Sequence, residues 1–181
     1  RRTEDARNLC NKIWNASRFV LMNSEGFRNE APKDLQPVDQ WILSRLSSCE
    51  QAVRAGYDNY DFQAVCQALY AFFWTDYCDW YLEACKSRLQ DPDLRQTPQA
   101  VLHQCLRAFL TMLHPIMPFL TEEVWSHLPG ADGTMLMGSD WCQIPSEWQN
   151  AECEGTVERW FSLTRAIRAL PGGWQLPILA M

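Results

Sequence analysis

The feature that most constrains the fold is an apolar stripe near the start of the chain, spaced for one face of an α-helix. Leu9, Ile13, Ser17 and Val20 recur at steps of three and four residues. This spacing predicts an amphipathic helix over residues 3–22 whose apolar face packs against a core.

A second stripe on the same predicted helix is polar. Asn8, Asn11 and Asn15 recur at helical steps and lead to Arg18 and Phe19. Asparagine is a poor helix former that prefers caps and turns, so something must compensate for these three amides. They could tie this helix to its neighbours, because buried polar groups are normally hydrogen-bonded, or they could face a ligand.

Helical periodicity continues along most of the chain. It predicts further helices at residues 37–56, 62–88, 97–113, a short helix capped by Thr121, and residues 150–170. Residues 129–145 are rich in turn signals and predict an irregular arm, with 134–137 extended. We therefore expect an all-α fold: an antiparallel helical bundle over residues 1–128, and an arm and C-terminal helix over 129–181 that pack on the bundle or follow it.

Length and composition set the frame for this fold. A chain of 181 residues, 47% of them hydrophobic, can bury the core of one domain with an appendage. No apolar run approaches the roughly 20 residues of a membrane span, so we expect no membrane partner and a cytoplasmic location. The chain starts in helical register without an initiating methionine, as expected of a segment excised from a larger protein.

Cysteine and histidine offer no recognisable metal site. The eight cysteines never form a Cys-x-x-Cys pair and mostly fall within apolar helical patterns, so we interpret them as reduced core residues. The histidines are not spaced to join them as zinc ligands. We expect neither a metal nor a cofactor in this segment.

The charge distribution bears on possible partners. A net charge of −6 argues against a nonspecific binder of polyanions, because phosphate contacts supply sequence-independent affinity for nucleic acids. Residues 1–28 nevertheless carry five arginines and one lysine, whereas residues 58–93 are acidic. One end of the molecule could face a polyanion, although an ordinary solvated helix surface explains the same pattern.

Residues 6–23 resemble the helix that opens the anticodon-binding domain of the valyl-tRNA synthetase family. Residues 39–46, 73–83 and 114–125 resemble later blocks of that family in the same order. The proline-bracketed block at 114–125 is shared with the synthetases for isoleucine and leucine, whereas Asn-Lys-Ile-Trp-Asn-Ala-Ser-Arg-Phe at 11–19 is typical of the valine family. The resemblance covers residues 6–125.

The resemblance implies a helical bundle that follows a Rossmann catalytic domain in the same parent chain and holds the anticodon stem-loop of a valine tRNA. The signatures of adenylate formation are absent from these 181 residues, so this segment should not catalyse a reaction alone. ATP and magnesium are implied for the parent enzyme, not for this segment.

The resemblance and RNA chemistry together select candidate contacts. Unpaired bases are recognised by stacking on aromatic rings and by hydrogen bonds to their edges. The residues predicted to bind the anticodon are Arg1, Arg7, Asn11, Asn15, Arg18, Phe19, Leu82 and Glu83. Phe19 matches a base-stacking position, and Glu83 could accept a hydrogen bond from a cytosine amino group. Phe19 could equally be an ordinary core residue.

Other functions remain open from the sequence. Asp76, Asp79 and Glu83 form an acidic stripe, but no nucleophile, histidine or metal ligand is spaced to join them, so we predict no catalytic residue. The chain could instead be the anticodon-binding domain of an isoleucyl- or leucyl-tRNA synthetase. A helical protein-interaction module without RNA affinity is the more distant alternative.

Overall fold

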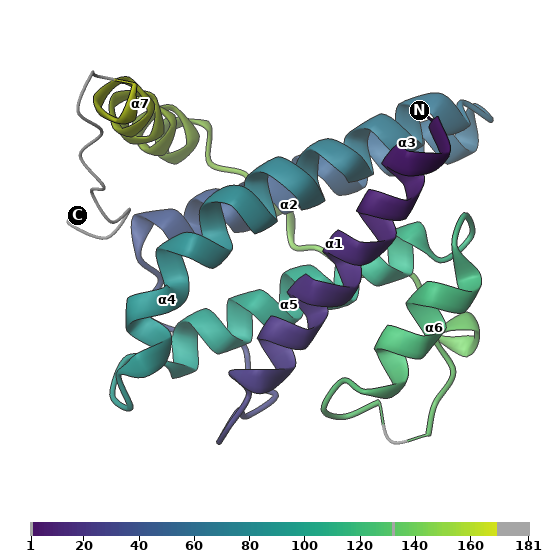
Figure 1. Ribbon diagram of the computed structural model, residues 1–181, viewed down its shortest axis with the longest axis horizontal. Coiled ribbons are helices and arrows are strands. Elements are labelled where there is room, and N and C mark those ends of the chain that lie inside the picture. Colours follow the sequence, from purple (N-terminus) through teal and green to yellow (C-terminus); the bar gives the residue numbers. More distant parts are fainter. Residues whose placement is uncertain (1, 132, 170–181) are drawn as a thin grey trace.

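The computed structural model describes residues 2–131 and 133–169, and within those ranges it contains helices and connecting segments but no strand. The predicted all-α bundle is therefore confirmed (Figure 1). The helices are α1 (Arg2–Met22), α2 (Pro37–Asp58), α3 (Phe62–Tyr70), a π-helix (Ala71–Tyr81), α4 (Leu82–Gln90), α5 (Gln96–Leu113), α6 (Pro118–Ser126) and α7 (Ala151–Arg168). Two short 3₁₀ turns, Leu136–Gly138 and Ser146–Trp148, interrupt the segment between α6 and α7. No helix in the described ranges is long and apolar enough to cross a membrane.

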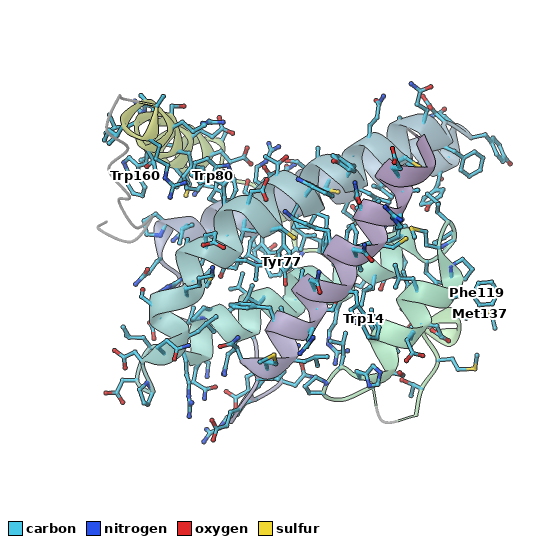
Figure 2. All side chains as sticks on the ribbon, viewed as in Figure 1. Trp14, Tyr77, Trp80, Phe119, Met137 and Trp160 are labelled. Atoms are coloured by element: carbon cyan, nitrogen blue, oxygen red, sulfur yellow. The ribbon has the colours of Figure 1, made fainter. Side chains whose placement is uncertain are left out.

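The stretch predicted as one helix at 62–88 is helical without a break from Phe62 to Gln90, but its middle is a π-helix. Its aromatic side chains form the centre of the core. The ring of Phe73 stacks on Phe109 of α5 with centroids 4.0 Å apart. Tyr77, which is labelled in Figure 2, donates a hydrogen bond from its hydroxyl to the Leu102 carbonyl. The π-helix and α5 are thereby joined through their buried faces.

A buried ion pair fixes the start of α2 against α4. Asp39 is fully buried, and the guanidinium of Arg88 donates to both of its carboxylate oxygens at 2.6 and 2.7 Å. The Tyr81 hydroxyl and the backbone N–H of Gln36 donate to the same carboxylate at 2.6 and 2.9 Å. Burial alone would lower the pKa of Arg88, but its hydrogen bonds to Asp39 and the negative charge of that carboxylate raise it.

Helix α7 packs against α2 and the end of the π-helix. Phe161 stacks on Trp80 with centroids 4.0 Å apart and meets Trp41 edge-on at 4.9 Å. On α2, Arg45 binds Glu154 and also Asp76 of the π-helix, with N–O distances of 3.4 and 2.9 Å. The C-terminal helix thus packs on the bundle, while the division into domains at residue 128 stays a prediction.

Two local predictions were wrong at the ends of elements. Helix α6 begins at Pro118, because proline at the first helical position has the required φ and needs no N–H partner. Thr121 lies inside that helix, where its hydroxyl donates to the Met117 carbonyl instead of capping it. Residues 134–137 run into a 3₁₀ turn instead of forming an extended piece. The predicted end of the last helix at residue 170 lies outside the described residues.

Candidate functional site

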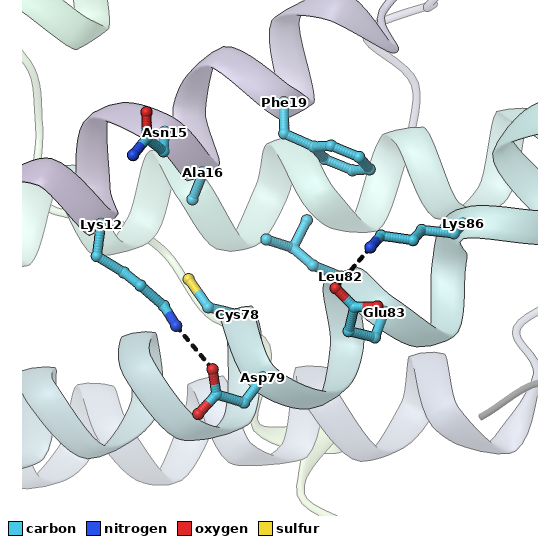
Figure 3. A pocket seen from close by; sticks show the side chains of 9 residues that line it. All are labelled: Lys12, Asn15, Ala16, Phe19, Cys78, Asp79, Leu82, Glu83 and Lys86. Carbon is cyan, nitrogen blue, oxygen red and sulfur yellow. Dashed lines mark hydrogen bonds and ion pairs between the residues drawn. The ribbon is translucent and has the colours of Figure 1, made fainter. Parts of the chain in front are cut away.

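A groove of about 470 Å³ lies between α1 and the helical stretch that contains the end of the π-helix and the start of α4 (Figure 3). Four residues predicted from the sequence line it: Asn15, Phe19, Leu82 and Glu83. Five further residues complete the lining: Lys12, Ala16, Cys78, Asp79 and Lys86. Residues about 60 positions or more apart in the sequence therefore line one groove.

The wall formed by α1 follows from helical spacing. Lys12, Asn15, Ala16 and Phe19 stand at i, i+3, i+4 and i+7, so their side chains share one face of the helix. Ala16 is buried, and its small side chain lets α1 approach Cys78 closely. Phe19 is half-buried, and its ring lies over Leu82 in the groove (Figure 3). Asn15 and Phe19 of α1 thus line the same groove as Leu82 and Glu83, while their predicted contacts with the anticodon stay predictions.

The charges in the groove are paired with one another. The Lys12 ammonium donates to Asp79 at 2.7 Å, and the Lys86 ammonium donates to Glu83 at 2.7 Å (Figure 3). Two cations and two anions cancel, so the groove offers hydrogen-bond donors and acceptors without a strong net field. Such a lining suits selection among ligands by their hydrogen-bonding edges better than it suits general attraction of phosphates.

Not every predicted site residue reaches the groove. Arg7 and Asn11 are exposed on α1 outside the groove lining. Arg18 borders a separate hollow of about 90 Å³ beside Trp14, Val124 and His127. Arg1 lies outside the described residues. The roles assigned to these four residues stay predictions, and Arg7, Asn11 and Arg18 could only contact a ligand that extends beyond the groove.

The segment after α1 holds the C-terminal end of that helix, and hence Phe19, against α5. The Ser24 hydroxyl donates to the Val20 carbonyl and lies 2.8 Å from Nε2 of His103. The ring of Phe27 stacks on His103 with centroids 4.0 Å apart. The side-chain amide of Gln99 donates to the carbonyl of Asn23 at 2.7 Å. These contacts attach the segment after α1 to α5, and with it the end of the helix that carries Phe19.

This attachment predicts a specific pH dependence of stability. Burial, reinforced by the charge of Arg107, lowers the pKa of His103 to about 4, whereas an unfolded histidine has a pKa of about 6.5. Between these two pKa values His103 binds a proton in the unfolded chain but not in the folded one. Stability is therefore lost as the pH falls from about 6.5 to 4. When the pH is lowered from 7.5 to 5.0, we expect the free energy of unfolding of the unmodified protein to fall by about 2 kcal/mol more than that of His103→Gln. Urea titrations at the two pH values measure this difference.

The control for that experiment is His127→Gln, because His127 is an exposed histidine on the surface of the same bundle. This variant should keep the full pH dependence of the unmodified protein. Equal pH dependence in the unmodified protein and in His103→Gln would contradict the assignment.

The acidic stripe at 76, 79 and 83 does not form one cluster. Asp76 is buried against Arg45, and burial raises the pKa of its carboxyl more than Arg45 lowers it. Asp79 and Glu83 are each paired with a groove lysine. No group of three or more His, Cys, Asp or Glu side chains in the described part of the chain could hold a metal ion.

The cysteines divide into two sets. Cys49, Cys78, Cys85 and Cys105 are buried, in agreement with the core interpretation, whereas Cys66 is exposed and the remaining three are half-buried. Burial raises the pKa of the Cys78 thiol, at the edge of the groove, to about 12. A thiol with so high a pKa is a poor nucleophile at neutral pH.

The fold and groove together define an all-helical bundle with an aromatic ring, an amide and paired charges on the facing walls of one groove. Residues 39–176 match the family described as the anticodon-binding domain of tRNA ligases. The chain belongs to this family. Its all-helical architecture is the one that the resemblance implied.

The individual relatives that match the chain are valine–tRNA ligases. The chain is similar to a valine–tRNA ligase of Thermotoga maritima, with 42% identity over 94% of this chain, and to one of Carboxydothermus hydrogenoformans, with 39% identity over 97%. A valine–tRNA ligase of Acinetobacter baylyi is 38% identical over 95% of this chain. The chain spans about a fifth of the length of these relatives.

Proposed function

We propose that the chain is the anticodon-binding domain of a valine–tRNA ligase and that the groove between α1 and α4 receives the anticodon of a valine tRNA. The observation that carries the proposal is that Asn15 and Phe19 of α1 face Leu82 and Glu83 across one groove. The similarity to valine–tRNA ligases over more than nine-tenths of the chain supports the choice of amino acid. Aminoacylation would require the parent's Rossmann catalytic domain, together with its ATP and magnesium.

The groove offers a stacking surface for the face of an unpaired base and hydrogen-bonding groups for its edge. The half-buried ring of Phe19 offers a stacking surface, and the amide of Asn15 can both donate to and accept from a base edge. Glu83 accepts from Lys86 through one carboxylate oxygen, Oε1, which leaves Oε2 to accept from an exocyclic amino group. Cytosine carries such a group, and valine anticodons end in adenine then cytosine.

Binding of the chain to a valine anticodon stem-loop at low salt tests the proposal. The comparison uses stem-loops changed singly at the second and third anticodon bases. We expect each change to weaken binding about 5- to 150-fold, because the loss of a base-edge contact costs about 1–3 kcal/mol. Equal affinity for all loops would contradict anticodon reading, and binding only to loops of isoleucine or leucine tRNAs would favour those synthetases. No RNA binding would favour the protein-interaction alternative.

The role of Glu83 gives a sharper prediction. Glu83→Gln should reduce the preference for cytosine over uracil at the third anticodon base at least fivefold, since the new amide can donate to the uracil O4 oxygen. The ratio of the two dissociation constants is the measured quantity. Asp79→Asn is the matched control, because it removes the same charge from the same groove beside Lys12. An equal loss of preference in both variants would show that charge, and not base recognition, is responsible.

A further inference from the structure

A pair of stacked aromatic rings lies outside the groove lining, nearer the start of the long helical stretch. Tyr70 and Trp74 lie parallel, with centroids 5.2 Å apart and an interplanar angle of 14°. Tyr70 is 44% exposed although it is a large aromatic residue. The ammonium of Lys12 lies 4.4 Å from the Trp74 ring centroid and 2.7 Å from Asp79 in the groove. Lys12 thus joins the aromatic pair to the groove.

The π-helix explains why the pair and the groove share a face. An α-helix turns about 100° per residue, whereas the wider π-helix, with its i→i+5 bonds, turns roughly 80°. Between Tyr70 and Glu83, across the eleven residues of the π-helix, the difference accumulates to about 220°. From Trp74, which lies within the π-helix, it accumulates to about 140°. In a continuous α-helix, Tyr70 and Trp74 would point away from Glu83 and Lys86. The π-helix brings these side chains towards α1: Lys12 contacts Trp74, Tyr70 borders a hollow with Leu9, and Glu83 and Lys86 line the groove with α1.

The spacing along the helix fits a strand of RNA. Trp74 and Leu82 are eight positions apart, which corresponds to about 10–12 Å along a helix axis. Successive nucleotides are at least about 3.4 Å apart, so this length holds roughly two or three of them. A base stacked on Phe19 above Leu82 would therefore have its neighbours beside Lys12 and the aromatic pair.

We propose that Tyr70 and Trp74 form a second stacking site, which takes an unpaired nucleobase flanking the anticodon in the same loop. The Lys12 ammonium donates one N–H to Asp79 and keeps further N–H donors for the phosphate between this base and the groove. The inference rests on the proposed function, because it assigns a further part of the anticodon loop to the same surface. Stacking on an aromatic ring tolerates any base, so this site adds affinity without adding sequence preference.

The chemistry of the pair favours RNA over a protein partner. A parallel pair of rings with a cation above one of them presents flat π-faces and a positive charge, which match a base and its phosphate. An aliphatic protein surface would leave the ammonium of Lys12 without a counterpart beyond Asp79.

The test is a comparison of Tyr70→Ala with Tyr70→Phe and Tyr60→Ala in the 181-residue chain, using a valine anticodon stem-loop. Tyr60 is 81% exposed and lies outside the groove lining and the aromatic pair, so its variant controls for loss of a surface tyrosine. We expect Tyr70→Ala to weaken binding about 5- to 150-fold, the range for one stacked base, and the other two variants to stay within twofold. Because Tyr70 is 44% exposed and stacks on Trp74, the unfolding midpoint of Tyr70→Ala should fall but stay above the temperature of the binding assay.

A second measurement identifies the base. Stem-loops with one abasic nucleotide are bound to the unmodified chain and to Tyr70→Ala. At one position flanking the anticodon, loss of the base should weaken binding to the unmodified chain but not to Tyr70→Ala. If Tyr70→Ala binds like Tyr60→Ala while the unmodified chain still discriminates anticodon bases, the second site is refuted and the proposed function stands. If the unmodified chain shows no such discrimination, both are refuted.

Discussion

Replacing Arg88 with methionine is expected to lower the free energy of unfolding by about 3–5 kcal/mol. The carboxylate of Asp39 is fully buried and accepts two of its four hydrogen bonds from Arg88. Removing the guanidinium leaves an uncompensated buried charge, which costs far more than the ion pair itself contributes. Equilibrium unfolding in urea at neutral pH measures the loss.

An exposed ion pair provides the comparison. Lys33→Met breaks the exposed pair with Glu30 and should change stability by no more than about 0.5 kcal/mol. A loss of less than about 1 kcal/mol in Arg88→Met would contradict this account of the core.

Replacing Phe19 with alanine is expected to weaken binding of the valine anticodon stem-loop about 5- to 150-fold, equivalent to about 1–3 kcal/mol. The ring lies over Leu82 in the groove, where it can stack on one base (Figure 3). Phe19→Tyr keeps the flat aromatic face and should retain most of the affinity. Fluorescence anisotropy with a labelled stem-loop provides both dissociation constants.

Trp14→Ala is the matched control for Phe19→Ala. Trp14 is a 43% exposed aromatic residue on the same helix, but it borders the hollow beside Val124 and not the groove. We expect its loss to change the affinity less than twofold. If both variants weaken binding equally, the aromatic residues of α1 would act through helix stability and not through stacking.

The first helix was largely readable from the sequence, because its apolar period fixes which face is buried. Ile13, Ser17 and Val20 are buried as predicted. The same period could have divided the candidate contacts more finely. Asn15 and Phe19 share a face with Lys12, whereas Arg18 lies on another side of the helix. The prediction treated the polar stripe as a single surface, and so it grouped Asn15 with Arg18, which lie on different sides of the helix.

The opposite wall of the groove was not readable from local pattern. Leu82 and Glu83 were selected through family resemblance, and Lys86 was missed because a surface lysine on a helix carries no distinctive signal. The π-helix adds a further obstacle. If residues are counted at 3.6 per turn through Ala71–Tyr81, the side chains that follow this segment are assigned to the wrong face relative to those that precede it. Only packing against α1 and α5 shows which side chains meet.

The small buried face of α1 has a consequence for how tightly the groove can bind. Four side chains of α1, those of Ile13, Ala16, Ser17 and Val20, are buried among the described ones, compared with thirteen in α5. Helices with few buried contacts detach at lower free-energy cost than the core elements. The groove exists only while α1 is docked, so the observed affinity equals the intrinsic affinity multiplied by the docked fraction. A ligand that bridges α1 and α4 therefore also acts as a clamp, and a substitution that merely loosens α1 would weaken binding without touching the ligand.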